Sequence, residues 1–353
     1  MAGRKKLKVA AISLGVVVLG LGAAAWSMWP TVDEVPEVLD AIDPEVSIAD
    51  LELEAQGPMP AVRLGDLEGK TVFLLIEGKE SMTGGEGKHL RRALHRWVLP
   101  ETVVGYSVGD APAGAKVMKG KIERDFVGPM RAELKMPIYV DFGGTFTDAF
   151  SLPKGHLGFV ILDPAGEVVY RKAGDLTEQE VAEVGDLLGA QEPPPGPPAP
   201  EFAVGPLTNE ACAGKPCVLV FLDRKVARSE IPGLEDGGFE GEMDEVFEQI
   251  RQPSIRLARI LAADWTAEDR GELTGVVVGE GEGWKVDGWE FVAEAPEARE
   301  AFGIGDAAAM VIVDAEGRVA FAETGVVPFW KLSLAADVLG IESKEYGKKR
   351  NKG

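Results

Sequence analysis

The chain is poor in the side chains that hold metals, because its 353 residues include only two cysteines and three histidines. The histidines, His89, His95 and His156, follow no known ligand spacing, and no cysteine lies near them in the sequence. Cys212 and Cys217 supply two sulfurs, which alone do not make a zinc site. We therefore expect no metal and no other cofactor.

Positive charge is also scarce. Lysine and arginine number 37 against 58 aspartates and glutamates, which gives a formal net charge of −21. An acidic surface of this kind repels nucleic acid and anionic lipid headgroups. We therefore expect neither to be a partner of the folded part, and solubility is the simplest role of the charge.

The N-terminus combines a basic start with a long uncharged run. Four cations lie within residues 1–8, and residues 9–29 carry no charge. About 20 apolar residues span the ~30 Å hydrocarbon core of a bilayer, and a basic flank stays in the cytoplasm. We predict a single-pass signal anchor at 9–29 in the inner (cytoplasmic) membrane, with the bulk of the chain periplasmic or extracytoplasmic. One alternative is a signal peptide cleaved near Ala23-Ala24-Ala25, which leads to the same compartment, and another is a buried helix of a soluble protein.

Composition divides the rest of the chain. Residues 30–57 are acidic and dotted with proline, so we predict a stalk that holds the folded part off the membrane. Residues 192–200 read EPPPGPPAP, and proline lacks the N–H group that helices and central strands need. We predict a semi-rigid linker there, between domains at 58–191 and 201–343, and the alternative is an internal loop of one larger domain. Residues 344–353 form a basic tail.

Both halves end in the same pattern. In the first half, an apolar run at 158–163, a turn at 164–166 and an alternating strand at 167–171 precede a helix pattern at 177–188. In the second half, the same order occupies residues 309–314, 315–317, 318–322 and 329–339. The pattern predicts a β-hairpin followed by a C-terminal helix, twice.

The early parts of the two halves also correspond. Continuous apolar runs at 71–76 and 218–222 suit buried central strands. Helix patterns follow at 87–97 and 240–251, and further strand patterns at 102–106 and 255–261. This β-α-β then β-β-α order predicts an α/β protein with two domains of three layers, each a central mixed sheet flanked by helices.

The order of elements resembles the thioredoxin superfamily over roughly residues 58–190 and 200–341. The first half is similar to membrane-tethered thiol-disulfide oxidoreductases and redoxins of bacterial envelopes, through LGDLEGK at 64–70 and LDPAG at 162–166. The resemblance implies two thioredoxin-like domains behind the N-terminal transmembrane helix, in a bacterial envelope.

The first half departs from that family at its redox site. In the family a Cys-x-x-Cys motif follows the first strand at a helix N-terminus, which lowers the pKa of the first thiol. The motif positions hold Ser81, Met82, Thr83 and Gly84, and the family's cis-proline position falls on Leu157. Serine cannot form a mixed disulfide, so we predict a redox-inactive domain. A serine nucleophile with a histidine base is an alternative for which the sequence gives no marker.

The second half resembles the non-catalytic thioredoxin-like domains of protein disulfide isomerases. Those domains can carry a cysteine pair before the central strand, as Cys212 and Cys217 lie here before 218–222. The cis-proline position falls on Ala308, so this domain also lacks the site. In an exported chain the two cysteines favour a structural disulfide, and the alternative is a redox pair that exchanges with partner thiols.

A redox site lost twice from a retained fold predicts a binding or scaffold module for exported or envelope proteins rather than an enzyme. The rival hypothesis is a thiol-disulfide oxidoreductase that uses Cys212 and Cys217. A third is a subunit of a larger envelope complex, with the linker setting the distance between two docking faces.

Overall fold

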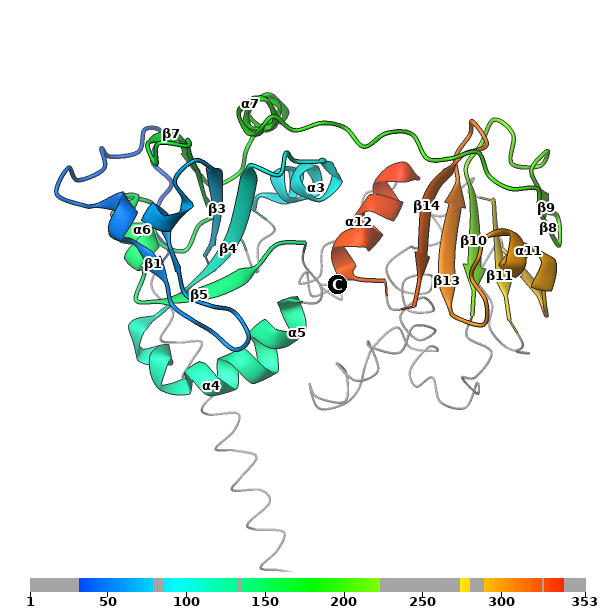
Figure 1. Cartoon of the computed structure of the whole chain (residues 1–353), viewed down its shortest axis with the longest axis horizontal. Coiled ribbons are helices and arrows are strands. Elements are labelled where there is room, and N and C mark those ends of the chain that lie inside the picture. Colours follow the sequence, from blue (N-terminus) through cyan, green and yellow to red (C-terminus); the bar gives the residue numbers. More distant parts are fainter. Residues whose placement is uncertain are drawn as a thin grey trace, which may run out of the picture.

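The computed structural model describes residues 32–78, 81, 86–131, 135–222, 274–279, 289–325 and 327–339. They form two five-stranded mixed sheets, side by side and joined by an extended segment (Figure 1). Within these ranges no helix has both the length and the apolar character needed to cross a bilayer. The anchor predicted at 9–29 and the tail at 344–353 lie outside the described residues.

The first sheet is built around β3 (Thr71–Glu77). On one side β3 runs parallel to β4 (Val103–Ala111), which runs parallel to β5 (Ile138–Phe142). On the other side it pairs antiparallel with β6 (Gly158–Leu162), which forms a hairpin with β7 (Val168–Ala173). The predicted strands are therefore confirmed, and β5 is an edge strand that the sequence pattern did not indicate.

Helices cover both faces of this sheet. Phe73 and Leu75 of β3 pack under α3 (Lys88–Arg96) and α7 (Glu178–Leu188), which match the predicted helices. Val72, Leu74 and Ile76 point to the opposite face, toward α6 (Thr145–Ala149) and the N-terminal segment. A helical stretch connects β4 to β5 through η3 (Ala113–Met118), α4 (Lys119–Ile122), η4 (Glu123–Val127) and α5 (Gly128–Arg131).

The acidic segment before the first domain does not stand free as the expected stalk. It contains η1 (Ile48–Asp50) and β1 (Glu52–Leu53), and Leu51 and Leu53 are buried in the core of the first domain. Farther upstream, the Asp40 carbonyl accepts a 2.5 Å hydrogen bond from Arg171 on β7. The prediction failed because these apolar residues are few and widely spaced, so they form no periodic pattern. The Asp33 N–H also donates to the Lys154 carbonyl at 3.1 Å, so residues 33–57 belong to the first domain.

The second sheet repeats the order and the strand directions of the first. Its strands, from edge to edge, are β12 (Glu290–Val292), β11 (Thr274–Val278), β10 (Cys217–Phe221), β13 (Ala309–Val313) and β14 (Val319–Thr324). The helices are α11 (Pro296–Ala301) on one face and α12 (Phe329–Val338) on the other. The sequence predicted a strand at residues 255–261, but the strand that runs parallel to β10 is β11. Residues 255–261 and the helix expected at 240–251 lie outside the described residues.

The two domains also agree in detail. The Asp163 carboxylate accepts hydrogen bonds from two backbone N–H groups of its hairpin turn, and Asp314 does the same in the second domain. Each domain begins with a small hairpin, β1 with β2 (Val62–Arg63) and β8 (Ala203–Val204) with β9 (Leu207–Thr208). The predicted internal repeat is therefore present as two mixed α/β domains with the strand arrangement of a thioredoxin-like fold.

The proline-rich segment covers the free edge of the second sheet. The Val319 N–H donates to Pro197 at 2.8 Å, and the Ala199 N–H donates to Gly317 at 2.9 Å. At Gly196 a Cβ would lie 1.9 Å from the Val319 carbonyl oxygen, so only glycine fits there. Paired in this way, the start of β14 is not open to another strand.

A side chain covers the edge strand of the first sheet. The Gln56 amide donates to the Val140 carbonyl at 2.5 Å and accepts from the Val140 N–H at 2.9 Å. Gln56 is buried and thus acts as a one-residue substitute for a sixth strand.

We expect Gln56→Ala to lower the stability of the first domain by about 2–3 kcal/mol, because it leaves two backbone groups of Val140 without their partners. Urea unfolding of the full chain measures the loss. Glu54→Ala is the matched control, since Glu54 makes exposed ion pairs with Lys116 and Lys119 that contribute about 0–1 kcal/mol. Equal effects of the two substitutions would contradict the assignment.

Candidate functional site

The position at which the sequence resemblance predicts a redox motif lies just past the end of β3. Ser81 is buried there, and its hydroxyl donates to the Gly78 carbonyl at 2.9 Å. Met82, Thr83 and Gly84 lie outside the described residues. Because the Ser81 hydroxyl is buried and donates to the Gly78 carbonyl, it presents no nucleophile to a partner.

Three backbone segments meet closely at this place. A Cβ on Gly78 would lie 2.3 Å from the carbonyl carbon of Gly155, and one on Gly87 would lie 2.1 Å from the Leu157 side chain. Gly87 also has a φ of 73°, which favours glycine. The ends of β3, α3 and β6 are therefore packed closely against one another.

Glu86 fills the place next to the cis-proline position. Its carboxylate accepts from the Leu157 N–H at 2.8 Å and lies 2.6 Å from Nδ1 of His156. Proline has no N–H, whereas Leu157 has one that needs a partner, and the chain's own Glu86 supplies it. No peptide bond in the described ranges is cis.

The three histidines lie in different surroundings. His89 is exposed on α3, His156 contacts Glu86 and the Asp33 carbonyl, and His95 is buried. In the described part of the chain, the hydrogen bonds of Ser81 go to Gly78 and Arg91 rather than to a histidine. The geometry does not assemble the serine–histidine pair that the alternative hypothesis requires.

The second domain fills the corresponding place with a cation. The Arg299 guanidinium is buried and donates to the carbonyls of Gly305 and Ala307, both at 2.9 Å, and to the Leu222 carbonyl at 2.5 Å. Leu222 directly follows β10, and Ala307 directly precedes Ala308, the cis-proline position. Arg299 thus ties together the two segments between which a redox site would lie.

Leu157 and Ala308 are equivalent in the structure. Both are fully buried and directly precede the first strand of the hairpin, and the carbonyl of each accepts a 2.8 Å hydrogen bond from a glycine, Gly174 or Gly325. The two residues therefore have the same surroundings in the two domains, and their assignment as cis-proline positions stays a prediction.

The two cysteines form a disulfide, with a Cα–Cα distance of 5.6 Å. Cys217 begins β10, Cys212 lies in the turn after β9, and both are at most 1% exposed. The loop is held to the hairpin turn by a 3.0 Å hydrogen bond from Gly214 to Ala315. The disulfide lies at the opposite end of the central strand from the place where the family's redox motif stands.

A carboxylate pair that the sequence did not indicate lies at the carboxyl ends of two parallel strands. Asp110 of β4 and Asp141 of β5 are register partners. Thr147 donates to Asp110 at 2.9 Å, and the Phe146 N–H donates to Asp141 at 2.8 Å. Burial raises the pKa of both carboxyl groups. The hydrogen bond from Thr147 opposes the rise at Asp110, and the hydrogen bond from the Phe146 N–H opposes it at Asp141. Both side chains thus anchor α6 to the sheet.

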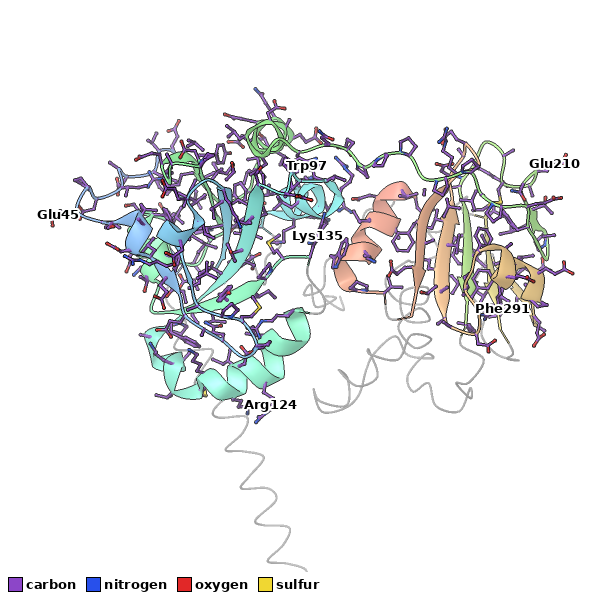
Figure 2. All side chains as sticks on the ribbon, in the orientation of Figure 1. Glu45, Trp97, Arg124, Lys135, Glu210 and Phe291 are labelled. Carbon is purple, nitrogen blue, oxygen red and sulfur yellow. A yellow bond between two sulfur atoms is a disulfide. The ribbon has the colours of Figure 1, made fainter. Side chains whose placement is uncertain are left out.

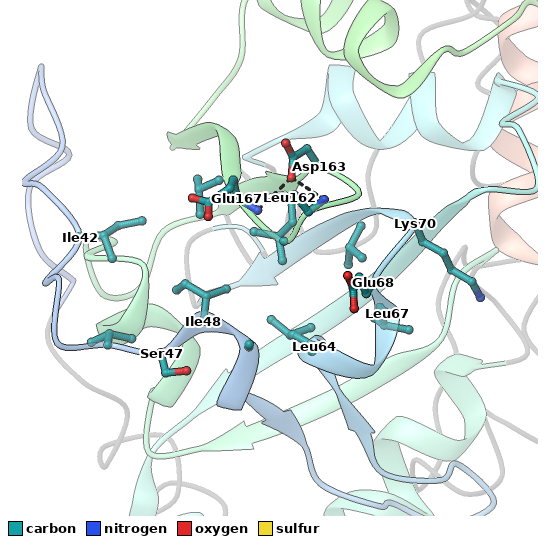
Figure 3. A pocket seen from close by; sticks show the side chains of 17 residues that line it. Ile42, Ser47, Ile48, Leu64, Leu67, Glu68, Lys70, Leu162, Asp163 and Glu167 are labelled. Carbon is teal, nitrogen blue, oxygen red and sulfur yellow. Dashed lines mark hydrogen bonds between the residues drawn. The ribbon is translucent and has the colours of Figure 1, made fainter.

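A cavity of about 540 Å³ lies at the start of β3, at the opposite end of the strand from Ser81 (Figure 3). Residues 42–49, η2 (Leu64–Leu67) and the hairpin turn after β6 form its walls. Asp163, in its wall, is already bonded to the turn. The described residues contain no group of three or more His, Cys, Asp or Glu side chains suited to a metal ion.

Comparison of the chain with models of protein families finds no match, and comparison with curated proteins finds none either. Among solved structures, the chain is similar to the exposed lipoprotein thioredoxin of Streptococcus pneumoniae strain TIGR4, at 19% identity over 40% of this chain and 100% of that one, with a TM-score of 0.29. It is also similar to a DsbF homologue from Corynebacterium diphtheriae, at 14% identity over 45% of this chain and 99% of that one, with a TM-score of 0.29.

We expect the thiol of Ser81→Cys to be alkylated at least about 100-fold more slowly than that of His89→Cys, because modification needs a local opening that costs about 3 kcal/mol. His89, which is exposed at the start of α3, is the matched control. Iodoacetamide labelling followed by mass spectrometry measures both rates. Similar rates would mean that the site after β3 is open.

We expect Asp110→Asn to raise the melting temperature at pH 7 by about 2–4 °C. The pKa of Asp110 is raised in the folded chain, so its ionised form is unfavourable at pH 7 and the neutral amide removes that cost. The gain should shrink as acidification protonates Asp110 in the wild type. Asp148→Asn is the control, because its side chain is 60% exposed. A destabilised Asp110→Asn protein would contradict the argument.

Proposed function

We propose that this protein is a membrane-tethered, extracytoplasmic binding or scaffold module whose two thioredoxin-like domains exchange no disulfides. The carrying observation is the place of the only two cysteines, which are paired and buried at the start of β10. Thiol exchange requires a thiolate to reach a disulfide sulfur in line with the bond. Here both sulfurs lie within the core, among Phe202, Val204 and Leu207.

The closed strand ends support the same proposal. Glu86 in the first domain and Arg299 in the second bond to the backbone groups around the former redox positions. A partner therefore binds elsewhere on the surface. The net charge of −21 favours partners that carry positive charge.

The location is part of the proposal. The uncharged run at 9–29 behind four cations supports a single-pass anchor in the inner membrane. The disulfide supports an oxidising compartment, since such bonds persist outside the cytosol. Exported or envelope proteins are then the partners within reach, either transiently or in a stable complex.

The rival proposal is a thiol-disulfide oxidoreductase that uses Cys212 and Cys217. One observation favours it: Gly214, with a φ of 80°, shapes a tight turn between the two cysteines, beside the cation Lys215. However, the pair opens a strand instead of a helix, so no helix dipole stabilises a thiolate.

We expect the disulfide of the folded protein to resist glutathione, with a reduction potential below about −300 mV. Differential alkylation and mass spectrometry across a glutathione series, followed by a dithiothreitol series, measure the potential. The urea-unfolded protein is the control, and its disulfide should be reduced readily. A potential near −200 mV, together with mixed disulfides to Cys212 or Cys217 in cells, would establish the rival.

A further inference from the structure

Within the described ranges, one helix from each domain takes part in the contact between them. Helix α12 of the second domain contacts α3 of the first (Figure 1). Arg92 on α3 lies 3.4 Å from the Asp337 carboxylate on α12, and both side chains are only about one-fifth exposed. This contact is separate from the strand ends and from the disulfide described above.

His95 lies at the centre of this contact. Its side chain is buried on α3, and its ring centroid lies 6.0 Å from that of Trp330 on α12. Lys135 lies 5.8 Å from the Trp330 ring and donates to the carbonyls of His95 and Trp97 at the end of α3. Figure 2 labels Lys135 and Trp97 on the side of the first domain that faces the second. The imidazole is therefore enclosed by an aromatic ring from the other domain and a cation from its own.

The surroundings of His95 disfavour a positive charge on it. Desolvation by burial, followed by repulsion from Lys135 and Arg91, lowers the pKa of His95 to about 4. On α12, Lys331 adds a further cation 5.4 Å from the Trp330 ring. The carboxylates of Glu77 and Asp337 form ion pairs with Arg91 and Arg92, two other residues of α3.

We propose that the contact between α3 and α12 is a pH-sensitive clasp, closed while His95 is neutral and released when acidification protonates it. The direction of this pH effect follows from the coupling between protonation of His95 and closure of the contact. A histidine freed from the contact would return toward its ordinary pKa of about 6.5, so the closed state is favoured above that pH. Its advantage is lost progressively as the pH falls from 6.5 toward 4.

Asp337 acts in the opposite direction. Burial raises the pKa of Asp337, while Arg92, Arg96 and Lys88 oppose the rise. Protonation of this carboxyl group therefore relieves a desolvation cost in the closed state. Its contribution cannot be the cause of release on acidification, which leaves His95 as the group that opens the clasp.

The proposal can be tested by measuring the distance between the domains at different pH values. The chain has only three histidines, so the effect of each can be separated by substitution. Donor and acceptor dyes on cysteines introduced at Glu178 and Glu297, both exposed, report the distance between the domains in the full-length protein in detergent. The native disulfide is buried and does not take up dye. From pH 7.5 to pH 5, the equilibrium constant for closure should fall by up to about 30-fold, and energy transfer should fall with it.

Three variants decide the outcome. His95→Gln should keep energy transfer constant across this range, and His89→Gln, exposed on the same helix, should behave as the wild type. Trp330→Ala should open the clasp at every pH and raise the pKa of His95, measured by NMR, from about 4 toward 6.5. Constant energy transfer in the wild type, or the same fall in His95→Gln, would overturn the proposal.

Discussion

Each domain depends on one strand that is buried on both faces. All five residues of β10 and the five from Val72 to Ile76 of β3 are at most 3% exposed. Such a strand must be held by neighbours on both sides and covered by helices above and below, because its backbone and side chains have no access to water. No residue within it can take part in chemistry with a partner. A side chain of this strand that reaches a partner must therefore lie at one of its two ends.

The ends of these strands are filled by polar groups of the chain itself. Backbone N–H and C=O groups at a buried strand end need partners whether or not a redox motif is present. In the first domain an anion, Glu86, meets an N–H group, and in the second a cation, Arg299, meets carbonyls. These opposite charges solve the same physical problem. A pair of domains that had merely lost its cysteines while keeping an open cleft would leave such groups facing water.

The sequence predicted elements that carry their own signal and missed those that depend on distant partners. The runs that became β3, β6, β10 and β13 are long enough to be recognised without tertiary information. Strand β5 contains the carboxylate of Asp141 and buries only its first two residues, so it lacks the continuous apolar run of those strands. The partnership of Gln56 with Val140 spans 84 residues, and that of Asp110 with Asp141 depends on strand register. Such contacts can be seen only after the sheet is assembled.

The short connection between the domains makes a small contact sufficient to join them. The Val98–Gln191 and Pro198–Arg318 bridges fasten the connecting segment to the first and second domains, respectively, so little free chain remains between them. A short tether holds two surfaces at an effective concentration in the millimolar range, and weak complementary faces then associate. Such a contact can close on a few interactions, so the loss of one of them weakens it. Two rigid domains joined by such a contact can present either one continuous surface or two separate ones.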